Sequence, residues 1–372
     1  MQITLLFHNY PKIANTKDPG QILVWLKKYG HNVTLVTNET SENSSLTDFD
    51  GVKVIKSVSL INYVIKNAKN IDCLILYHLT FNSGIISLFY RIFSKSGLII
   101  LKLDSDGRVW ERSVPLFFRI YKFLIGETKI IPYIVSKTVN LIIIESPDAK
   151  MRILERYHFF NGKLTVLPNG VNADELTLLS KTLTDVKKSK KILFVGQIIY
   201  RKGIDLLVKA FSRLKDDYTD WLIELVGPFN EPGYKKELDG LITTSGLTGR
   251  VIFLENLKGA QLVRKYVESM IFCFPSRYES FGLVLIEAMY LGLPVIASDI
   301  GCSSYILDNG KCGLIVAPEN VDELTTALKK LIESVDLREE LSIKAKERCD
   351  KMFRWGDIVL KLLDMINLKL YV

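Results

Sequence analysis

The feature that most constrains the fold is an alternation of short, uninterrupted apolar runs with segments of helical periodicity. Strands buried on both faces need such continuous runs, and the helices between them imply right-handed βαβ units. The pattern predicts two doubly wound, Rossmann-like α/β domains. The predicted strands lie at 3–7, 33–36, 73–77, 98–101 and 141–144 in the first half, and at 192–195, 222–226, 251–254, 271–274, 295–297 and 314–316 in the second half.

A polar, lysine-rich stretch at residues 179–190 separates the two sets of strands. Such a stretch, without strong periodicity, is typical of an exposed connection. We therefore expect a first domain at residues 1–185, a second domain at 186–353, and a terminal helix at 354–372. Because ligands bind outside the carboxyl ends of the strands in doubly wound sheets, the expected site is the cleft between the two domains.

The composition excludes several classes of protein. The 372 residues are 48% apolar and 24% charged, which argues against a disordered, fibrous or disulfide-dense chain. The five cysteines form no CxxC pair, and no Cys/His cluster has metal-ligand spacing, so we expect neither a disulfide frame nor a zinc site. The first residues lack a cationic signal region, and no stretch reaches roughly 18 uninterrupted apolar residues. We expect a cytoplasmic protein.

The net charge of +8 is concentrated in the first half. Residues 1–172 contain 21 Lys and Arg against 13 Asp and Glu, whereas residues 173–372 contain 28 of each kind. This asymmetry fits an anionic partner, such as a membrane surface, a phosphorylated acceptor or nucleic acid, and equally a solvated basic face. Nucleic acid is not expected, because no recognised binding motif is present.

Two stretches, 85–95 and 109–125, mix basic residues with aromatic and aliphatic ones. A helix of this composition can lie in the headgroup region of an anionic leaflet, or it can be an ordinary core-facing helix. We favour a peripheral contact with the inner face of the plasma membrane.

The most informative stretch for chemistry is Phe274-Pro-Ser-Arg-Tyr-Glu279-Ser-Phe-Gly282-Leu-Val-Leu-Ile-Glu287. A buried strand ends at Pro-Ser, and a helix is predicted to start near Phe281 or Gly282. The amides at a helix amino terminus favour an anion, and a glycine in the first turn lets a diphosphate approach the backbone closely. Carboxylates do not bind phosphate, but Glu279 and Glu287 can accept hydrogen bonds from sugar hydroxyls. A nucleoside diphosphate sugar has both kinds of group.

This stretch resembles the donor signature of the family 4 glycosyltransferases of the GT-B fold, in which two glutamates are separated by seven residues after Pro-Ser. The resemblance extends over most of the chain. It implies that Glu279 contacts the donor sugar, that Glu287 binds the ribose hydroxyls, and that the amides of Phe281, Gly282 and Leu283 hold the diphosphate. Ser280 is also expected among the residues that bind the nucleotide sugar.

A second element is Phe194-Val-Gly196-Gln-Ile-Ile-Tyr-Arg-Lys202-Gly203, which precedes a predicted helix. It resembles the Val-Gly-Arg and Lys-Gly signature of the same family, which implies that Lys202 is the cation at the diphosphate, beside Gly196. Gln197 stands where the family commonly has arginine. Arg201 is a candidate replacement, although a solvated Arg-Lys pair at a helix start explains the same residues.

The resemblance assigns the acceptor to the first domain, where the sequence departs further from the family. Gly20 ends a loop in which two glycines are common. Asp104 and Asp106 occupy the place where many relatives carry a histidine near the donor sugar, and they either replace that histidine or belong to a Ser-Asp-Gly turn. His78 is a further candidate in the cleft, or else a satisfied core histidine.

The leading hypothesis is a retaining transfer of a hexosyl unit from a UDP- or GDP-sugar to a hydroxyl of a glycan or lipid-linked acceptor. Retention and the lack of a required metal are implied by the family, in which the departing phosphate accepts the acceptor proton. No permanently bound cofactor is expected, and the proposed catalytic residues are Glu279 and Lys202.

Two alternatives stay open. One is a non-catalytic sugar-nucleotide-binding subunit, which Gln197, the missing histidine, and Tyr305 in place of a common glutamate favour. The other is an epimerase or phosphorylase of the same fold.

Overall fold

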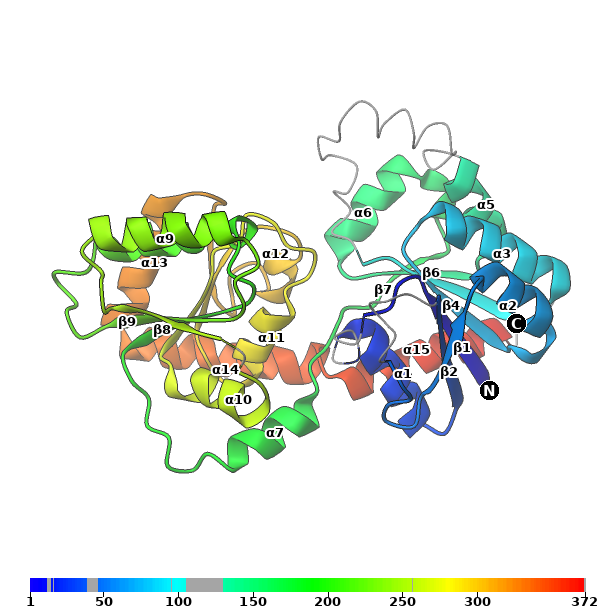
Figure 1. The fold of residues 1–372 in the computed structure, drawn as a ribbon, viewed down its shortest axis with the longest axis horizontal. Helices are drawn as coiled ribbons and strands as arrows, with labels where there is room; N and C mark the ends of the chain where they lie inside the picture. The colour runs from blue at the N-terminus through cyan, green and yellow to red at the C-terminus, as the bar shows by residue number, and fades with distance from the viewer. Residues whose placement is uncertain are drawn as a thin grey trace. The chain divides into compact units, whose positions relative to one another are not determined.

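The computed structural model describes residues 1–11, 15, 17–38, 46–94, 96–104, 130–255 and 257–370. The chain forms two compact units (Figure 1). The first unit consists of Met1–Asn169 and Trp355–Val372, and the second consists of Gly170–Arg354. Each unit is built on one sheet in which the paired strands are parallel. The predicted class of two doubly wound, Rossmann-like units is confirmed.

The first unit has a seven-stranded sheet in the order β3-β2-β1-β4-β5-β6-β7. The five predicted strands of this half are all present, whereas β3 and β7 were not predicted. Both lie at sheet edges, where strands are short and carry polar residues. The strands are β1 (Gln2–Phe7), β2 (Asn32–Asn38), β3 (Lys53–Ser57), β4 (Cys73–Tyr77), β5 (Leu98–Lys102), β6 (Leu141–Ile144) and β7 (Leu164–Val166).

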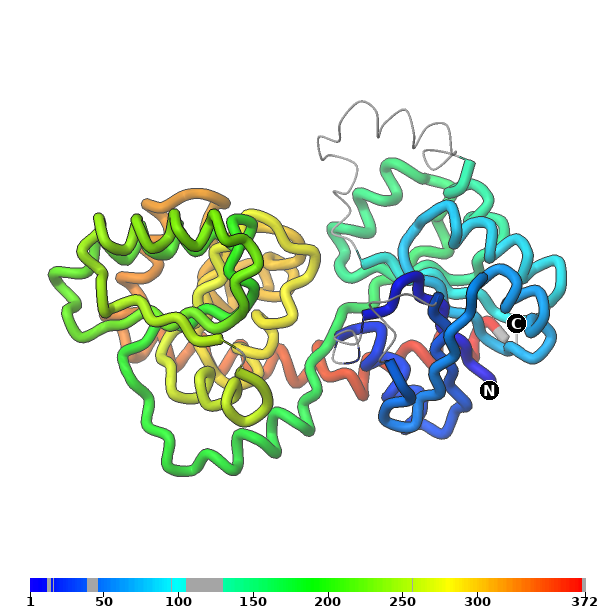
Figure 2. Tube along the Cα trace, viewed as in Figure 1, coloured from blue at the N-terminus to red at the C-terminus, as the bar shows by residue number. Residues whose placement is uncertain are grey.

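Helices cover both faces of this sheet. Alternate residues of the strands pack against α1 and α15 on one face, and against α2, α3, α5 and α6 on the other. Figure 2 shows α15 beside α1, although these helices lie at opposite ends of the chain. The helical elements are α1 (Asp18–Lys28), α2 (Leu60–Asn67), η3 (Ala68–Asn70), α3 (Phe81–Phe93), α5 (Ile130–Thr138), α6 (Pro147–Arg156), η4 (His158–Phe160) and α15 (Trp355–Leu370).

The second unit has a six-stranded sheet in the order β10-β9-β8-β11-β12-β13. All six predicted strands of this half are present. Their continuous apolar runs are explained by burial on both faces. The strands are β8 (Lys191–Val195), β9 (Leu222–Val226), β10 (Val251–Leu254), β11 (Ile271–Phe274), β12 (Val295–Ser298) and β13 (Leu314–Val316).

The helices of the second unit also form two layers. The core on one face includes residues of α8, α9 and α13, and the core on the other includes residues of α7, α10, α11 and α12. The helical elements are α7 (Ala173–Lys181), η5 (Tyr200–Lys202), α8 (Ile204–Ser212), α9 (Pro232–Thr244), α10 (Gly259–Glu268), α11 (Leu283–Tyr290), α12 (Ser303–Ile306), α13 (Val321–Glu333) and α14 (Val335–Met352).

The boundary between the units lies after Asn169, earlier in the chain than the expected position 185. Val171 and Ala173 are buried in the core of the second unit, so the segment before the lysine-rich stretch already belongs there. The terminal helix α15 belongs to the first unit, where the hydroxyl of Tyr29 donates a hydrogen bond to the carbonyl of Gly356 at 3.2 Å.

No helix in the described ranges is both long and apolar enough to cross a membrane. Asp106 and residues 109–125, for which a cleft role and a membrane contact were considered, lie outside the described residues.

Candidate functional site

The two predicted donor segments meet at the carboxyl ends of β8 and β11, which are neighbours in the middle of the second sheet. The chain order reverses between these strands, since β9 and β10 extend the sheet on one side, and β12 and β13 on the other. In doubly wound sheets this reversal is the switch point at which ligands bind.

Lys202 is the last residue of η5, which is the next element along the chain after β8. Only 7% of the residue is exposed, and its ammonium forms an ion pair with the carboxylate of Glu279. The same ammonium lies 5.3 Å from the centroid of the Phe274 ring. A cation this deeply buried needs a charged or polar partner, and Glu279 supplies it.

Glu279 lies in the loop between β11 and α11. One carboxylate oxygen accepts a hydrogen bond from the amide of Ser280 at 3.2 Å, and the other faces Lys202. Arg201 is also near, with 3.9 Å between its guanidinium and that second oxygen. The structure therefore brings together the two proposed catalytic residues, which the sequence offered in separate segments.

The helix after Glu279 begins at Leu283, close to the predicted start. Gly282 is the N-cap residue, in a left-handed conformation with φ 101° and ψ 61°, and no side chain caps the helix through this position. The first-turn amides of such a helix can bind an anion. Phe281, which precedes the cap, is buried with 2% exposure.

The backbone that follows β12 packs closely against the loop that bears Glu279. Gly301 has φ 54°, and a Cβ atom there would lie 2.2 Å from the carbonyl oxygen of Glu279. It would also lie 2.7 Å from the carbonyl oxygen of Ser280. No side chain fits in this space, so the path of the Glu279 loop depends on a glycine at position 301.

Glu287 lies in α11 and faces α10, where the hydroxyl of Tyr266 donates a hydrogen bond to its carboxyl at 3.0 Å. Burial raises the pKa of Glu287 to about 7, the bond from Tyr266 opposes this rise, and the nearby charge of Glu175 in α7 adds to it. The carboxyl group therefore changes protonation near neutral pH.

The remaining predicted donor residues have different surroundings. The amide of Gly196 donates to the carbonyl of Val226 at 2.9 Å, and Gln197 is exposed. Arg201 donates to the carbonyl of Tyr278 at 2.9 Å, so it holds the loop that bears Glu279. Tyr305 packs edge-on against the Phe353 ring, with 6.1 Å between the centroids.

The predicted acceptor residues lie at the carboxyl edge of the first sheet. His78 follows β4, is exposed, and has φ 61°, so it is not a buried core histidine. Its ring meets the Phe7 ring edge-on at 5.8 Å. Asp104 is exposed after β5, whereas Gly20 is buried in the first turn of α1.

A buried ionic cluster at the same edge was missed in the sequence. The ammonium of Lys102 lies 3.2 Å from Asp18 and 3.4 Å from Glu145, and the amide of Asn169 donates to Glu145 at 2.5 Å. Burial raises the pKa of Glu145 well above its usual range, and Lys102 opposes that rise. A charged residue directly after a continuous apolar run, as at Lys102 and Glu145, is the signal that could have revealed the cluster.

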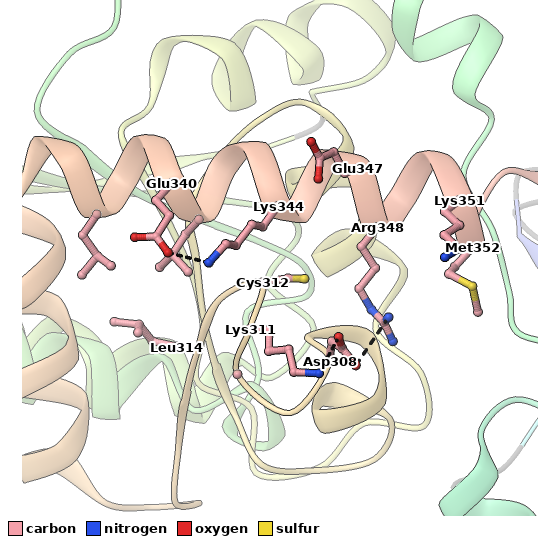
Figure 3. A pocket seen from close by; sticks show the side chains of 13 residues that line it. Asp308, Lys311, Cys312, Leu314, Glu340, Lys344, Glu347, Arg348, Lys351 and Met352 are labelled. Carbon is pink, nitrogen blue, oxygen red and sulfur yellow. Dashed lines mark hydrogen bonds and ion pairs between the residues drawn. The ribbon is translucent and has the colours of Figure 1, made fainter.

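A separate open cavity of about 620 Å³ lies beside α14 (Figure 3). Its charged residues largely neutralise one another, because Asp308 pairs with Lys311 at 3.3 Å and with Arg348 at 3.7 Å, and Glu340 pairs with Lys344 at 2.5 Å. None of the predicted donor residues lines it.

The described ranges contain no group of three or more His, Cys, Asp or Glu side chains placed to hold a metal ion. Transfer without a required metal stays a prediction.

Comparison with known proteins finds similarity to glycosyltransferases. Residues 178–348 match the family described as glycosyl transferases group 1. An uncharacterized glycosyltransferase of Methanocaldococcus jannaschii is 26% identical over 226 residues, which cover 58% of this chain and 57% of that protein. A D-inositol 3-phosphate glycosyltransferase of Corynebacterium jeikeium is 30% identical over 58% of this chain and 54% of its own length. The matches thus span little more than half of these relatives.

Among solved structures, Anabaena HepE in complex with UDP is similar over 99% of this chain and 100% of its own, with a TM-score of 0.80 and 18% identity. This likeness establishes the GT-B fold.

Proposed function

We propose that this chain is a retaining glycosyltransferase that moves a hexosyl unit from a nucleoside diphosphate sugar to an acceptor hydroxyl. The observation that carries the proposal is the ion pair of Lys202 and Glu279 at the switch point of the second sheet, beside the uncapped start of α11. Family 4 membership and retention come from the resemblance of the motifs around these residues.

The pair matches the two chemically different ends of such a donor. A diphosphate needs a cation and amide donors, which Lys202 and the first turn of α11 offer. A sugar has neutral hydroxyl groups, which can donate hydrogen bonds to the carboxylate of Glu279. Since the anomeric carbon joins the sugar directly to the diphosphate, the two groups must lie side by side, as they do here. Glu287, which lies further along α11, would accept hydrogen bonds from the ribose hydroxyls.

In the proposed reaction the bond between the anomeric carbon and the diphosphate oxygen breaks, and the electron pair leaves with the diphosphate. The acceptor oxygen forms its bond to that carbon on the same face, and its proton passes to the leaving phosphate oxygen. Lys202 and the helix amides stabilise the charge that develops on the diphosphate, which is a large source of rate enhancement in such transfers. Glu279 positions the sugar.

The donor nucleotide is proposed to be UDP or GDP, with UDP first because HepE binds UDP. A thermal-shift screen across UDP-, GDP- and ADP-sugars tests this choice, since a ligand that binds only the folded state at 100 times its Kd stabilises it by about 2.7 kcal/mol.

Donor hydrolysis and transfer assays with the stabilising sugar test the activity itself. Glu279→Gln and Lys202→Met should each abolish sugar release while the circular dichroism spectrum stays that of the wild type. Wild-type protein that binds a sugar nucleotide but releases no sugar from it would instead be a binding subunit. Full activity in either variant would refute the assignment of these residues.

The acceptor is proposed to be a glycan or a lipid-linked molecule, reached at an anionic membrane surface. Apolar side chains are exposed on two helices of the first unit that pack against each other, namely Ile92 and Phe93 of α3, and Ile130 and Tyr133 of α5. Lys137 adds a cation 5.3 Å from the Tyr133 ring. Exposed apolar groups beside basic ones favour the headgroup region of anionic lipid.

Vesicle flotation tests this contact. Wild-type protein should float with phosphatidylglycerol vesicles and not with phosphatidylcholine vesicles, and an Ile92→Asp/Ile130→Asp variant should stay at the bottom of the gradient. Flotation of that variant at the wild-type level would contradict the proposed surface.

A further inference from the structure

Two tripeptides run side by side at the carboxyl ends of β8 and β11. One is Tyr200-Arg201-Lys202 and the other is Arg277-Tyr278-Glu279. The amide of Arg277 donates to the carbonyl of Arg201 at 2.9 Å, which joins their backbones. Each tripeptide contains one tyrosine and one arginine, and each ends in one of the two proposed catalytic residues.

The two arginine side chains cross between these loops. Arg201 donates from Nη1 to the carbonyl of Tyr278 at 2.9 Å, and Arg277 donates from Nη1 to the carbonyl of Tyr200 at 2.8 Å. Each loop thus holds the backbone of the other through an arginine, close to the residue that faces the proposed donor.

Arg277 is itself fixed by a bidentate ion pair. Its Nη1 and Nη2 donate to the two carboxylate oxygens of Asp205 at 2.7 and 2.8 Å, and its Nε donates to Glu319 at 2.8 Å. The guanidinium also lies 3.9 Å from the centroid of the Tyr200 ring. Paired planar contacts of this kind restrict both position and orientation.

Asp205 is a rigid anchor for that pair. It lies in the first turn of α8, is 9% exposed, and accepts a hydrogen bond from the hydroxyl of Tyr234 at 2.9 Å. Burial acts to raise its pKa, but the hydrogen bonds from Arg277 and Tyr234 prevail and lower the pKa to about 2. The carboxylate is therefore ionised at neutral pH.

We propose that Arg277 and Asp205 form a positioning pair, which holds Lys202 and Glu279 at the separation that a nucleoside diphosphate sugar requires. This inference rests on the proposed function. Arg277 acts through the two loops, because its guanidinium is engaged by Asp205, Glu319 and the Tyr200 carbonyl. A displacement of reacting groups by about 1 Å can cost on the order of 100-fold in rate, so a small loosening of the loops matters.

The test compares Arg277→Gln, Arg277→Lys, Asp205→Asn and the double variant Arg277→Gln/Asp205→Asn. We expect kcat to fall by about 10- to 100-fold in Arg277→Gln while KM changes by less than about threefold, because positioning acts mainly on the transition state. Arg277→Lys should recover only part of the loss, since lysine cannot form the bidentate contact. The double variant should be no worse than the poorer single variant, because the two residues act as one unit.

Arg213→Gln is the matched control. Arg213 pairs with Asp322 on the exposed surface of the same unit, so its removal also deletes an Arg–Asp pair but should leave kcat unchanged. Three results would each overturn the positioning role. The first is a kcat in Arg277→Gln within twofold of the wild-type value, and the second is a loss of kcat fully explained by a smaller folded fraction. The third is a double variant whose loss of kcat equals the product of the two single losses.

Hydrogen exchange separates this outcome from failure of the proposed function. In ligand-free protein, backbone amides in 199–203 and 276–282 should exchange at least about tenfold faster in Arg277→Gln than in wild type, and their exchange should not change in Arg213→Gln. If wild-type protein transfers no sugar, the proposed function fails and the exchange result alone decides whether the pair holds the loops. Unchanged exchange in both segments would overturn it.

Discussion

Lys202 and Glu279 form an ion pair although 77 positions separate them in the sequence, and neither side chain is more than 17% exposed. A pair this buried should be strongly coupled, because removal of one partner leaves the other charge poorly solvated. A double-mutant cycle with Lys202→Met and Glu279→Gln, measured by urea unfolding, should give a coupling free energy of about 1–3 kcal/mol.

The control cycle uses Lys235 and Asp239, an exposed pair on α9 with 2.7 Å between the charged atoms. Its coupling should stay below about 0.5 kcal/mol, as is usual for exposed helix pairs. Equal coupling in the two cycles would show that burial does not strengthen the Lys202–Glu279 pair.

Gly301→Ala should displace the loop that bears Glu279. The new Cβ would meet the Glu279 carbonyl at 2.2 Å, and the left-handed backbone at this position is itself unfavourable for alanine. We expect a stability loss of about 2–4 kcal/mol and a fall in donor hydrolysis of at least about tenfold. Thermal unfolding and the hydrolysis assay measure the two effects.

Gly259→Ala separates backbone strain from the clash. Gly259 has φ 51°, close to the 54° of Gly301, but a Cβ there would have no neighbour within 4 Å. It should lose only about 1 kcal/mol, the usual cost of the left-handed conformation, and keep its hydrolysis rate. If both variants lost the same activity, contact with the Glu279 loop would not be the cause.

The fold was readable from the sequence because buried parallel strands leave continuous apolar runs. All eleven predicted strands are present, whereas β3 and β7 were missed. In β3 only Val54 and Ile55 are consecutive apolar residues, and in β7 Thr165 separates Leu164 from Val166, so neither strand leaves a continuous run of three apolar residues. The boundary was placed too late because polarity marks exposure of a segment, and does not reveal which core its neighbours enter.

The two segments proposed to bind the donor could be selected from the sequence because their residue types and spacing are local properties. Their mutual geometry could not be predicted, since the contact of Arg277 with Asp205 joins the loop after β11 to the first turn of α8, and single-sequence patterns contain no information on such pairs. Lys102 and Glu145 were overlooked for a related reason. Each lies at the end of an apolar run, and only the parallel pairing of β5 and β6 brings them together.

Glu287 should make stability depend on pH in the slightly acidic range. Its pKa is about 7 in the folded protein, above the ordinary value of 4.5, chiefly because of burial. The unfolded chain therefore loses this proton at lower pH than the folded protein does, and the contribution of Glu287 to stability is lost as pH rises from about 4.5 to 7. The melting temperature of the wild type should fall relative to that of Glu287→Gln across this window. Parallel curves between pH 4.5 and 8 would contradict the assignment.

The same carboxyl group should couple nucleotide binding to protons. Ribose hydroxyls donate to an ionised carboxylate better than to a protonated one, so UDP should bind more tightly at pH 8 than at pH 6, and this difference should shrink in Glu287→Gln. Calorimetry at the two pH values measures it. A pH dependence that is the same in both proteins would assign the coupling to another group.

Lys102→Met should destabilise the first unit, because it leaves Asp18 and Glu145 as buried carboxyl groups without a cation. In the wild-type protein the charge of Lys102 opposes the rise in pKa that burial causes in both groups. Without Lys102 both pKa values should rise further. The unfolded chain then releases these protons at lower pH than the folded protein, and the stability of the variant should fall as pH rises above about 4. We expect the free energy of unfolding to fall by about 3–5 kcal/mol at pH 8 and by less at pH 5, measured by urea unfolding.

The double variant Lys102→Met/Glu145→Gln should recover part of this loss at pH 8, because it removes one of the two buried charges. A loss that is the same at both pH values and is not recovered in the double variant would show that packing of the lysine stem matters more than its charge.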